Sequence, residues 1–404
     1  MTLSSHIKHL ALELGFDAVG ITRPDSLTEG ERAIAGWVRE GRHGGMNYLE
    51  EFEARKKRFY ADFPDAKSVI VLGVNYYTNG RSHPSPDIRH QKYPPHPALS
   101  PSEGEGQGEG VLRGRVARYA WGRDYHEVIR ERHAALIQEI QKIAPENFRA
   151  KSCVDTQPVP ERFAAQRAGL GFLGKNTMLL SRKFGPWLFL SEIVTPLELE
   201  EDLPDAGDCG TCDRCQKICP TGALDEDYKI DARKCIAYLT IEHKGVIPRE
   251  LRPKIKDWIF GCDECLTVCP FTSRQIASPR EEFQPEQGAG PWLEMDKLFD
   301  VRSNREYEKI FAGSAVLRAS RKQMLRNASI VLGNSRRPEA LPYLTKALHD
   351  PAPLVRLHAA WGLGQMECQE ARDILDKRYC EEPDPSVKEE IEFALAGQSL
   401  RPGV

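Results

Sequence analysis

Eight cysteines lie close together in the chain, with spacings that suit iron–sulfur ligation. The first four follow the pattern C-x2-C-x2-C-x3-C-P, from Cys209 to Cys219. Bacterial ferredoxins hold 4Fe-4S clusters with this run, and proline follows its last cysteine there too. A shorter run of the same kind extends from Cys262 to Cys269, and Cys235 lies 27 positions before it. These residues predict one-electron transfer through two clusters.

The ferredoxin pattern also predicts how the cysteines divide between the two clusters. Three closely spaced cysteines hold one cube, while the cysteine before proline crosses to the other. Two zinc sites are the alternative, but zinc sites rarely combine such a run with a second, truncated copy. The predicted ligands of one cluster are Cys209, Cys212, Cys215 and Cys269, and those of the other are Cys219, Cys235, Cys262 and Cys265.

The rest of the composition favours a cytoplasmic protein. The 404 residues carry a formal net charge of −3, which neither excludes nor requires a nucleic-acid partner. Residues 4–16 combine helical spacing with charges of both signs, unlike a signal peptide. No apolar run approaches the ~20 residues of a membrane-spanning helix. We therefore expect a cytoplasmic monomer without a membrane partner, whose reduced thiols bind metal instead of forming disulfides.

The segments before the cysteines have the pattern of an α/β domain. A continuous apolar run at residues 68–77 is typical of a buried strand. Further strands are expected at 150–154 and 187–195, with helices ending near 143 and spanning 161–168. Residues 80–112 are rich in Pro, Ser, Gly, His and Glu, which predicts a disordered insertion. We assign an α/β domain to residues 1–198 and a ferredoxin-like module to residues 199–290.

The last part of the chain, residues 291–404, has a helical pattern with a short internal repeat. The segment 327–334 resembles the segment 358–365, at an offset of 31 residues. Such a repeat predicts stacked helix pairs of the HEAT type. The start of this part is also basic, which fits contacts with phosphate groups but also fits a solvated helix face. Between residues 302 and 337 the basic residues are Arg302, Arg305, Lys309, Arg318, Arg321, Lys322, Arg326, Arg336 and Arg337.

A glycine-rich segment, 169–177, partly matches two phosphate-binding motifs. The sequence GLGFLGKNT satisfies G-x-G-x-x-G and almost satisfies the Walker pattern. It follows a helical pattern instead of a strand, and Asn176 takes the position of the magnesium-binding Ser or Thr. We therefore do not predict a nucleotide site. Three glycines still allow the backbone to approach a ligand closely, so we expect a ligand-contacting loop.

Several of these motifs together resemble the epoxyqueuosine reductase family. The resemblance rests on RYAWGRDYH at 118–126, VDTQP at 154–158, ER at 161–162, the segment 167–177 and the ferredoxin-like module with a HEAT-like tail. It covers nearly the whole chain. The sequence departs from the family at Gln157, where Gly is more usual, and in the insertion at 80–112.

The resemblance implies an oxidoreductase that acts on tRNA. Members of the family reduce epoxyqueuosine, at the wobble position of the anticodon, to queuosine, with loss of the epoxide oxygen as water. They use cobalamin fed by two 4Fe-4S clusters, and their cobalamin domain is related to reductive dehalogenases. Residues 1–198 would then bind cobalamin, residues 291–404 would bind tRNA, and a flavodoxin or ferredoxin would supply electrons.

The resemblance also implies individual site residues. Asp155 matches the acidic position of the family motif and would donate a proton, helped by partial burial that raises its pKa. An Asx-turn or helix-capping role is the alternative for this residue. We expect no axial histidine below cobalt. The cofactor contacts expected besides Asp155 are Arg58, Tyr119, Lys175, Asn176 and Asp263, and the tRNA contacts are Arg318, Arg321, Lys322 and Arg326.

Two other functions remain compatible with the residues alone. One is a reductive-dehalogenase-like cobalamin enzyme that acts on a small molecule. The other is a non-catalytic ferredoxin-type carrier that passes electrons to a partner docked on the helical tail.

Overall fold

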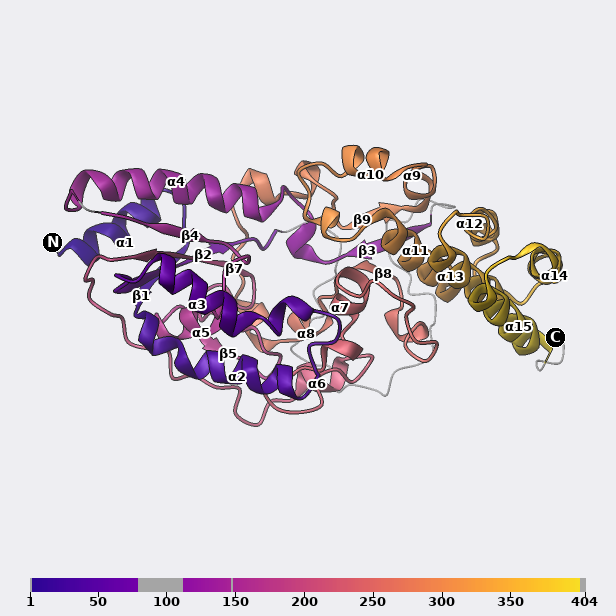
Figure 1. Cartoon of the computed structure of the whole chain (residues 1–404), viewed down its shortest axis with the longest axis horizontal. Coiled ribbons are helices and arrows are strands. Elements are labelled where there is room, and N and C mark those ends of the chain that lie inside the picture. The colour runs from indigo at the N-terminus through magenta and orange to yellow at the C-terminus, as the bar shows by residue number, and fades with distance from the viewer. Residues whose placement is uncertain (1, 79–111, 147, 400–404) are drawn as a thin grey trace.

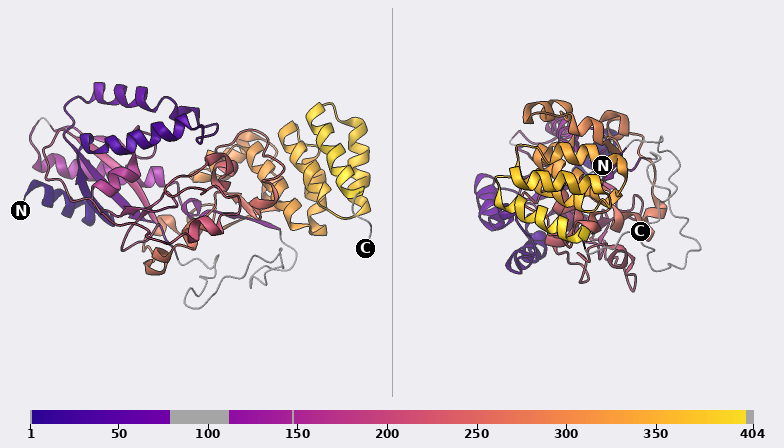
Figure 2. Two further views of the ribbon diagram at one scale, coloured as in Figure 1. Left: turned by 90° about the horizontal axis from the view of Figure 1, so that it is seen from below. Right: turned by 90° about the vertical axis from the view of Figure 1, so that its right-hand side faces the viewer.

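The computed structural model describes residues 2–78, 112–146 and 148–399, which form an elongated molecule (Figure 1). An α/β body lies at one end, a helical tail lies at the other, and the cysteine-rich segment lies between them (Figure 2). The predicted insertion falls outside the described residues except for Leu112, which is buried. Among the described helices, none has the length and apolarity to cross a membrane.

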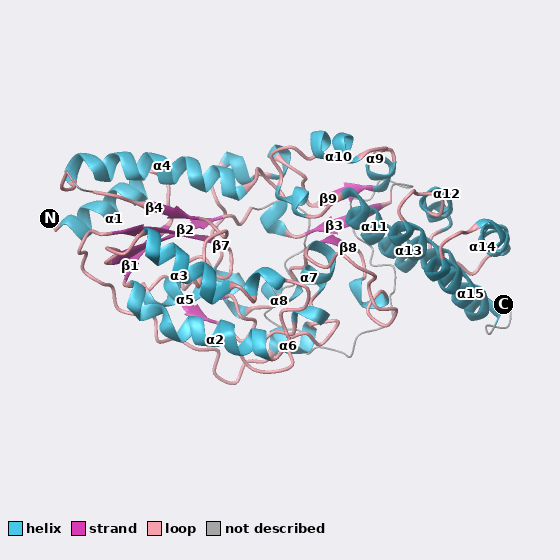
Figure 3. Cartoon of the chain, viewed as in Figure 1, coloured by secondary structure: helices cyan, strands magenta, loops and turns pink. Residues whose placement is uncertain are grey.

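The α/β body is built on a four-stranded sheet in the order β1-β2-β7-β4 (Figure 3). All neighbouring strands in this sheet are antiparallel. Strand β2 (Ser68–Asn75) is central and buried along its whole length, so the apolar run that predicts a buried strand is confirmed. The other strands are β1 (Ala18–Thr22), β4 (Lys151–Cys153) and β7 (Leu188–Thr195).

Helices cover both faces of this sheet. Alternate residues of a strand point to opposite faces, so Ile70 and Leu72 belong to one apolar cluster while Val69 and Val71 belong to another. Each cluster removes one sheet face from water, which holds the layers together. The first face packs against α1 (Leu3–Glu13) and α4 (Tyr125–Ile143), and the second lies under α2 (Thr28–Arg39), α3 (Phe52–Asp62) and α5 (Glu161–Arg167).

A second, three-stranded sheet joins segments from all three predicted domains. β3 (Arg113–Val116) pairs in parallel with β8 (Trp258–Phe260) and antiparallel with β9 (Trp292–Glu294). A single apolar cluster extends from Val116 through Ile259 into the helical tail. The boundaries at 198/199 and 290/291 therefore mark changes of sequence pattern, while side-chain packing is continuous across them.

The cysteine-rich segment contains three short helices and is preceded by a small hairpin. The helices are α6 (Arg214–Ile218), α7 (Ile236–Ile241) and α8 (Glu264–Thr267). The hairpin consists of β5 (Phe172–Leu173) and β6 (Leu179–Leu180). Because these elements are short, turns and loops carry most of the cysteines.

Packed helices form the C-terminal tail. The two segments of the 31-residue repeat lie in α11 and α13, which cross so closely that a Cβ on Gly333 would lie 2.7 Å from Cα of Gly362. The two helices leave no room for larger side chains at this crossing, which explains the glycines of the repeat. The tail helices are α9 (Met295–Phe299), α10 (Asn304–Ile310), α11 (Arg321–Ser335), α12 (Leu341–Ala347), α13 (Pro353–Gly364), α14 (Gln369–Glu381) and α15 (Pro385–Ser399).

Candidate active site and iron–sulfur ligands

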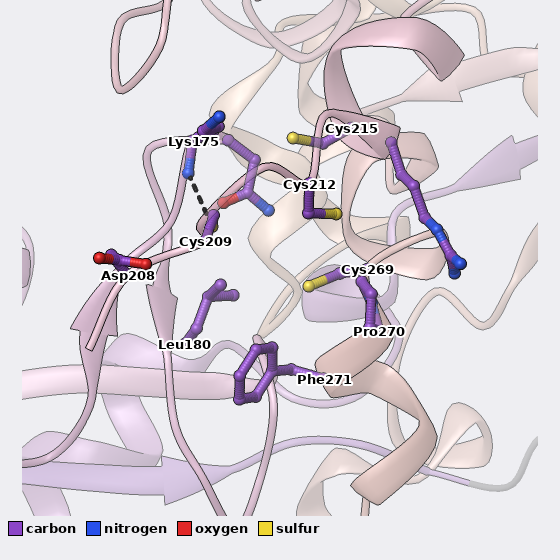
Figure 4. Close-up of a pocket in the computed structure, with 11 residues that line it drawn as sticks. Lys175, Leu180, Asp208, Cys209, Cys212, Cys215, Cys269, Pro270 and Phe271 are labelled. Carbon is purple, nitrogen blue, oxygen red and sulfur yellow. Dashed lines mark hydrogen bonds between the residues drawn. The ribbon is translucent and has the colours of Figure 1, made fainter.

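Four of the predicted cluster ligands line one cavity in the cysteine-rich segment. The cavity has a volume of about 70 Å³. Two of the cysteines lie in the loop before α6, and one lies in α6. The fourth ends the second cysteine run, directly before the turn Pro270–Arg274. Figure 4 shows their side chains around the same open space. They are Cys209, Cys212, Cys215 and Cys269.

The size and chemistry of this cavity fit a 4Fe-4S cluster. Its volume is several times that needed by one water molecule, so it suits a polyatomic group better than a single ion. The N–H of Lys175 donates to Sγ of Cys209 at 3.4 Å, a contact that stabilises the negative charge of a cluster. Burial raises the pKa of Cys215 and of Cys269 to about 11, and bound iron would ionise such thiols.

The other four predicted ligands, Cys219, Cys235, Cys262 and Cys265, are all partly buried. Burial is the main cause of the raised pKa values of Cys235, Cys262 and Cys265, and the charges of neighbouring cysteines add to it. The charge of Cys219 acts on Cys235 and on Cys265, which supports the predicted place of Cys219 in this group. The crossed division of the cysteines between the two clusters stays a prediction. Helices α6 and α8, which contain Cys215 and Cys265, pack against each other, so the two groups are neighbours.

The glycine-rich segment is the β5–β6 hairpin, and its glycines face the protein itself. A Cβ on Gly171 would lie 2.4 Å from the carbonyl oxygen of Leu180, and one on Gly174 would lie 2.6 Å from Oδ1 of Asn176. Hairpin packing therefore accounts for these glycines, and the ligand-contacting loop stays a prediction. Lys175 and Asn176 at the hairpin tip line the cavity of the first cysteine group.

Asp155 lies in the loop after β4 and has a left-handed backbone, with φ 55°. Its N–H donates to Oε1 of Glu161 at 2.7 Å, and its carboxylate, 57% exposed, accepts a hydrogen bond from the Tyr125 hydroxyl at 3.1 Å. Arg55 donates to the carbonyl of Thr156 at 2.7 Å. A strained backbone that neighbouring residues hold in place is a feature of functional sites.

His126 lies beside this carboxylate. Its Nε2 is 3.5 Å from Oδ2 of Asp155, and its Nδ1 is 2.8 Å from Oδ1 of Asp124. Asp124 also accepts the backbone N–H of His126 and caps the N-terminus of α4. Burial disfavours the charged ring, but the two carboxylates outweigh it and raise the pKa of His126 to about 9. The ring is therefore an imidazolium at neutral pH.

The pKa of Asp155 is lowered, chiefly because the His126 ring lies beside the carboxylate, and this outweighs the opposing effect of burial. The expectation that partial burial raises this pKa is wrong. Sequence alone could not give the sign, because the histidine reaches Asp155 only through the fold. At neutral pH Asp155 is a carboxylate.

Two further carboxyl groups lie near Asp155. Burial, together with the charge of Asp155, raises the pKa of Glu161 to about 8. Glu192, on β7, is fully buried, and neither of its oxygens has a hydrogen-bond partner within the part of the chain that the structure describes. Burial, followed by the charges of Glu161 and Asp155, raises the pKa of Glu192 well above its usual value.

The second cysteine group and Asp155 border on a common region. Asp263 lies between two cysteines of that group and accepts the N–H of Arg118 at 2.7 Å. Burial raises the pKa of Asp263 to about 6. Burial also raises the pKa of Tyr119, and the charges of Asp155, Glu242 and Asp263 add to that effect. The Tyr119 ring lies 6.2 Å from that of Tyr125, the residue that donates to Asp155, and Tyr119 packs on the same apolar cluster as Cys235 and Cys262.

Comparison with known proteins identifies related families for three parts of the chain. Residues 57–156 match the model described as epoxyqueuosine reductase QueG, DUF1730. Residues 208–272 match a 4Fe-4S double cluster binding domain, and residues 313–396 match HEAT repeats. Together these matches follow the order of elements in the structure.

Curated relatives extend this likeness to the whole chain. The chain is 38% identical over 366 residues to the epoxyqueuosine reductase of Pseudomonas aeruginosa, covering 89% of this chain and 94% of that protein. It is 35% identical over 364 residues to that of Escherichia coli, covering 90% and 89%. The chain belongs to the epoxyqueuosine reductase family.

Solved structures of epoxyqueuosine reductases share the fold. A crystal structure of one with an epoxyqueuosine-modified tRNA-Tyr stem loop superposes with a TM-score of 0.82 at 30% identity, covering 98% of this chain and 99% of that one. A structure of the Streptococcus thermophilus enzyme gives a TM-score of 0.81 at 28% identity, covering 99% and 100%. The predicted combination of an α/β body, a ferredoxin-like segment and a HEAT-like tail is confirmed for this family member.

The tail residues expected to contact tRNA differ in their surroundings. Arg318 is exposed and pairs with Glu242 at 2.7 Å, and Lys322 is exposed. Arg321 is mostly buried against Asp350, at 2.9 Å. Arg326 is 0% exposed, and its guanidinium donates to backbone carbonyls of the cysteine-rich segment. The expectation that Arg326 contacts tRNA is therefore wrong, because this side chain joins the tail to that segment.

Sequence reasoning missed several residues around Asp155. Tyr125 and His126 belong to the segment 118–126, but nothing in the sequence indicates that they face a loop 30 residues further along the chain. Glu161 was interpreted only as the start of a helix. Arg58 is mostly exposed and lies 4.0 Å from Glu51, whereas Arg55, on the preceding turn of α3, reaches the Asp155 loop.

Proposed function

We propose that this chain reduces epoxyqueuosine at the wobble position of tRNA to queuosine. Membership of the epoxyqueuosine reductase family supports this reaction. The observation that carries it is an exposed carboxylate, Asp155, which accepts a hydrogen bond from Tyr125. The Tyr125 ring lies beside that of Tyr119, which packs on the same apolar cluster as two cysteines of the second group. Electron delivery and proton delivery would therefore meet at one place.

The reaction needs two electrons and two protons. Both C–O bonds of the epoxide break, one C=C bond forms, and the oxygen leaves as water. The two cysteine groups are proposed to hold 4Fe-4S clusters, which supply electrons one at a time. The region must therefore also contain a group that collects two electrons before the substrate reacts.

We assign that task to cobalamin, bound between Asp155 and the second cysteine group. When bound, cobalamin supplies a strongly nucleophilic, two-electron-reduced metal centre. The chemistry of the local side chains fits its amide-rimmed ring, since the Tyr119 hydroxyl and the Asp263 carboxyl can both form hydrogen bonds there. Lys175 and Asn176 are instead assigned to the first cluster, whose cavity they line. Arg58 is left out of the contacts because it pairs at the surface with Glu51.

The protein's own contribution centres on the proton at the departing oxygen. Asp155 is proposed to deliver it, and the hydroxyl of Tyr125 fixes the carboxylate that does so. The left-handed backbone at Asp155 directs the side chain away from the regular path of the chain. General acid catalysis of this kind contributes about 10²–10⁴-fold to a rate.

Substrate and electron donor would approach from different parts of the chain. We propose that Arg318 and Lys322, on the tail, contact tRNA phosphates, since both are exposed and the charges of Arg318 and Asp155 act on each other. A flavodoxin- or ferredoxin-type donor would deliver electrons beside the half-buried Cys212 of the first group and Arg214, which lines the same cavity. We further propose that the chain acts as a cytoplasmic monomer.

The proposal is tested by reconstituting the purified chain anaerobically with iron, sulfide and cobalamin. The loaded enzyme is reduced and mixed with tRNA that contains epoxyqueuosine, and the digested nucleosides are measured by mass spectrometry. We expect loss of the epoxide mass and gain of queuosine. Absence of conversion despite full cluster and cobalamin content would reject the proposed substrate. Conversion without cobalamin would reject the proposed two-electron centre.

A further inference from the structure

Asp155 needs a proton source, because its carboxylate is ionised in the observed arrangement. Tyr125 donates to Oδ2 at 3.1 Å, and His126 faces the same oxygen at 3.5 Å. Both contacts favour the negative form and lower the pKa of Asp155, with His126 making the larger contribution. An ionised carboxylate can pass a proton on only after it has received one.

We propose that His126 supplies the protons that Asp155 delivers to the substrate oxygen, and that Asp124 is the positioning residue that orients the His126 ring. This inference rests on the proposed epoxide reduction. In each transfer the Nε2–H bond of His126 breaks as an O–H bond forms on Asp155, and that proton then passes to the departing oxygen. Two such transfers, with the two electrons from the external donor, convert the epoxide to alkene and water.

Three consecutive residues build this relay at the start of α4. Oδ1 of Asp124 accepts from the backbone N–H of His126 at 2.9 Å and lies 2.8 Å from Nδ1 of the same residue. A proton on Nδ1 is therefore held by Asp124, so Nε2 is the atom left to face Asp155. The ring of Tyr125 stacks on His126 at 4.0 Å and on Phe189 at 4.4 Å, which restrains the imidazole from turning.

The distance between Nε2 of His126 and Oδ2 of Asp155 must shorten before a proton can pass between them. At 3.5 Å, Nε2 and Oδ2 are slightly beyond hydrogen-bond distance. Catalytic hydrogen bonds often tighten only when substrate is bound, and the carboxylate is on a loop, after β4. After each transfer the neutral ring must regain a proton from solvent. The His126 side chain is partly exposed, which allows this step.

Charged groups from several elements decide the protonation of the relay. Asp124 faces His126 from the helix cap, and Asp155 faces it from the β4–α5 loop. The charge of Arg130 acts on Asp124, that of Arg318 acts on Asp155, and the charges of Glu161 and His126 act on each other. These surroundings hold the pKa of His126 at about 9, so a proton is present at neutral pH and is lost as pH rises through 9.

Variants of His126 and Asp124 test the inference. Single-turnover conversion is measured between pH 6 and pH 10 with pre-reduced, fully loaded enzyme. His126→Gln should slow the chemical step at least 100-fold, with unchanged cofactor content and tRNA affinity. Asp124→Asn keeps a good helix cap but removes the charge that raises the His126 pKa, so its deficit should grow with pH. His9→Gln, at an exposed position on α1, is the matched control.

The outcomes separate this inference from the proposed function. If the unmodified enzyme converts its substrate while His126→Gln keeps the same rate and pH profile, the relay is rejected and the function stands. If Asp124→Asn loses the same fraction of activity at every pH, Asp124 has only a structural role. If the fully loaded unmodified enzyme fails to convert the substrate, the proposed function itself is rejected.

Discussion

The backbone N–H of Asp155 donates a 2.7 Å hydrogen bond to the carboxyl group of Glu161, six residues further along the chain. This bond closes the loop between β4 and α5, where Asp155 has a left-handed backbone. Asp155, the proposed proton donor, and the first residue of α5 therefore form one structural unit. In this unit the Asp155 side chain is free to act on a substrate, whereas the Glu161 side chain holds the loop. Substitutions at the two residues should therefore have different effects.

Substitution of Asp155 should separate chemistry from stability. Asn tolerates a left-handed backbone nearly as well as Asp, so Asp155→Asn should retain its melting temperature and cofactor content. Turnover should fall at least 100-fold, because the amide cannot relay a proton. Asp155→Ala should lose turnover and about 1 kcal/mol of stability, since Ala is strained at φ 55°. Thermal melts and single-turnover assays check both; an active Asn variant would show that the acid lies elsewhere.

Substitution of Glu161 should affect turnover through the loop. Gln still offers an oxygen to the N–H of Asp155, so Glu161→Gln should keep most activity. Glu161→Ala removes the acceptor, so kcat should fall about 10-fold or more, as expected when a positioning contact is lost. The tRNA affinity should remain unchanged in both variants. Equal activity of the Ala and Gln variants would show that this hydrogen bond does not position Asp155.

The fold was largely predictable because its signals are local. The apolar run at 68–77 predicts the central strand β2, and the 31-residue repeat predicts the packed pair α11 and α13. The shared three-stranded sheet was not predictable. Its strands are short, with three or four residues each, and they come from distant segments. Strand pairing between such segments leaves no periodic signal in any one of them.

The site was predictable where residue type and spacing decide the chemistry. The spacing of the cysteines predicts two clusters, and the match to a 4Fe-4S double cluster binding domain confirms this prediction, while the division of the cysteines between the clusters stays a prediction. The protonation of Asp155 could not be predicted, because it depends on His126, which the fold brings to 3.5 Å. Arg326 is similar, since its charge suggested a phosphate contact but the fold buries it against backbone carbonyls.

Crossed ligation makes a spectroscopic prediction. Cys215 and Cys269 are 54 positions apart in sequence, yet both line the first cavity. Replacing either by Ser should perturb the same cluster in the EPR spectrum of the reduced protein and lower the iron content by up to about half. Cys219→Ser should perturb the other cluster. Cys368→Ser, at an exposed cysteine, is the control. Loss of the same signal in Cys215→Ser and Cys219→Ser would contradict the crossing.

Glu192 should make stability depend on pH. Its folded-state pKa is raised well above the usual value by burial, so the folded state binds a proton that the unfolded state releases above pH ~4.3. This group's contribution therefore falls as pH rises from there toward the folded pKa, by up to about 1.4 kcal/mol per pH unit. Glu192→Gln cannot ionise, so it should gain stability relative to the unmodified chain between pH 5 and pH 8. Urea unfolding at pH 5 and at pH 8 measures the difference in unfolding free energy between the variant and the unmodified chain. An equal difference at the two pH values would contradict the prediction.

Substitutions of two neighbouring basic residues of the tail should have different effects, one on tRNA affinity and the other on stability. Lys322→Ala removes an exposed charge, so tRNA affinity should fall and its salt dependence should weaken by about one unit of slope, without loss of stability. Arg326→Ala leaves several buried backbone carbonyls without their donor, so the chain should lose about 3 kcal/mol of stability. Lys377→Ala, at an exposed site on α14, is the control for charge. Unchanged tRNA affinity in Lys322→Ala across salt concentrations would remove this residue from the proposed interface.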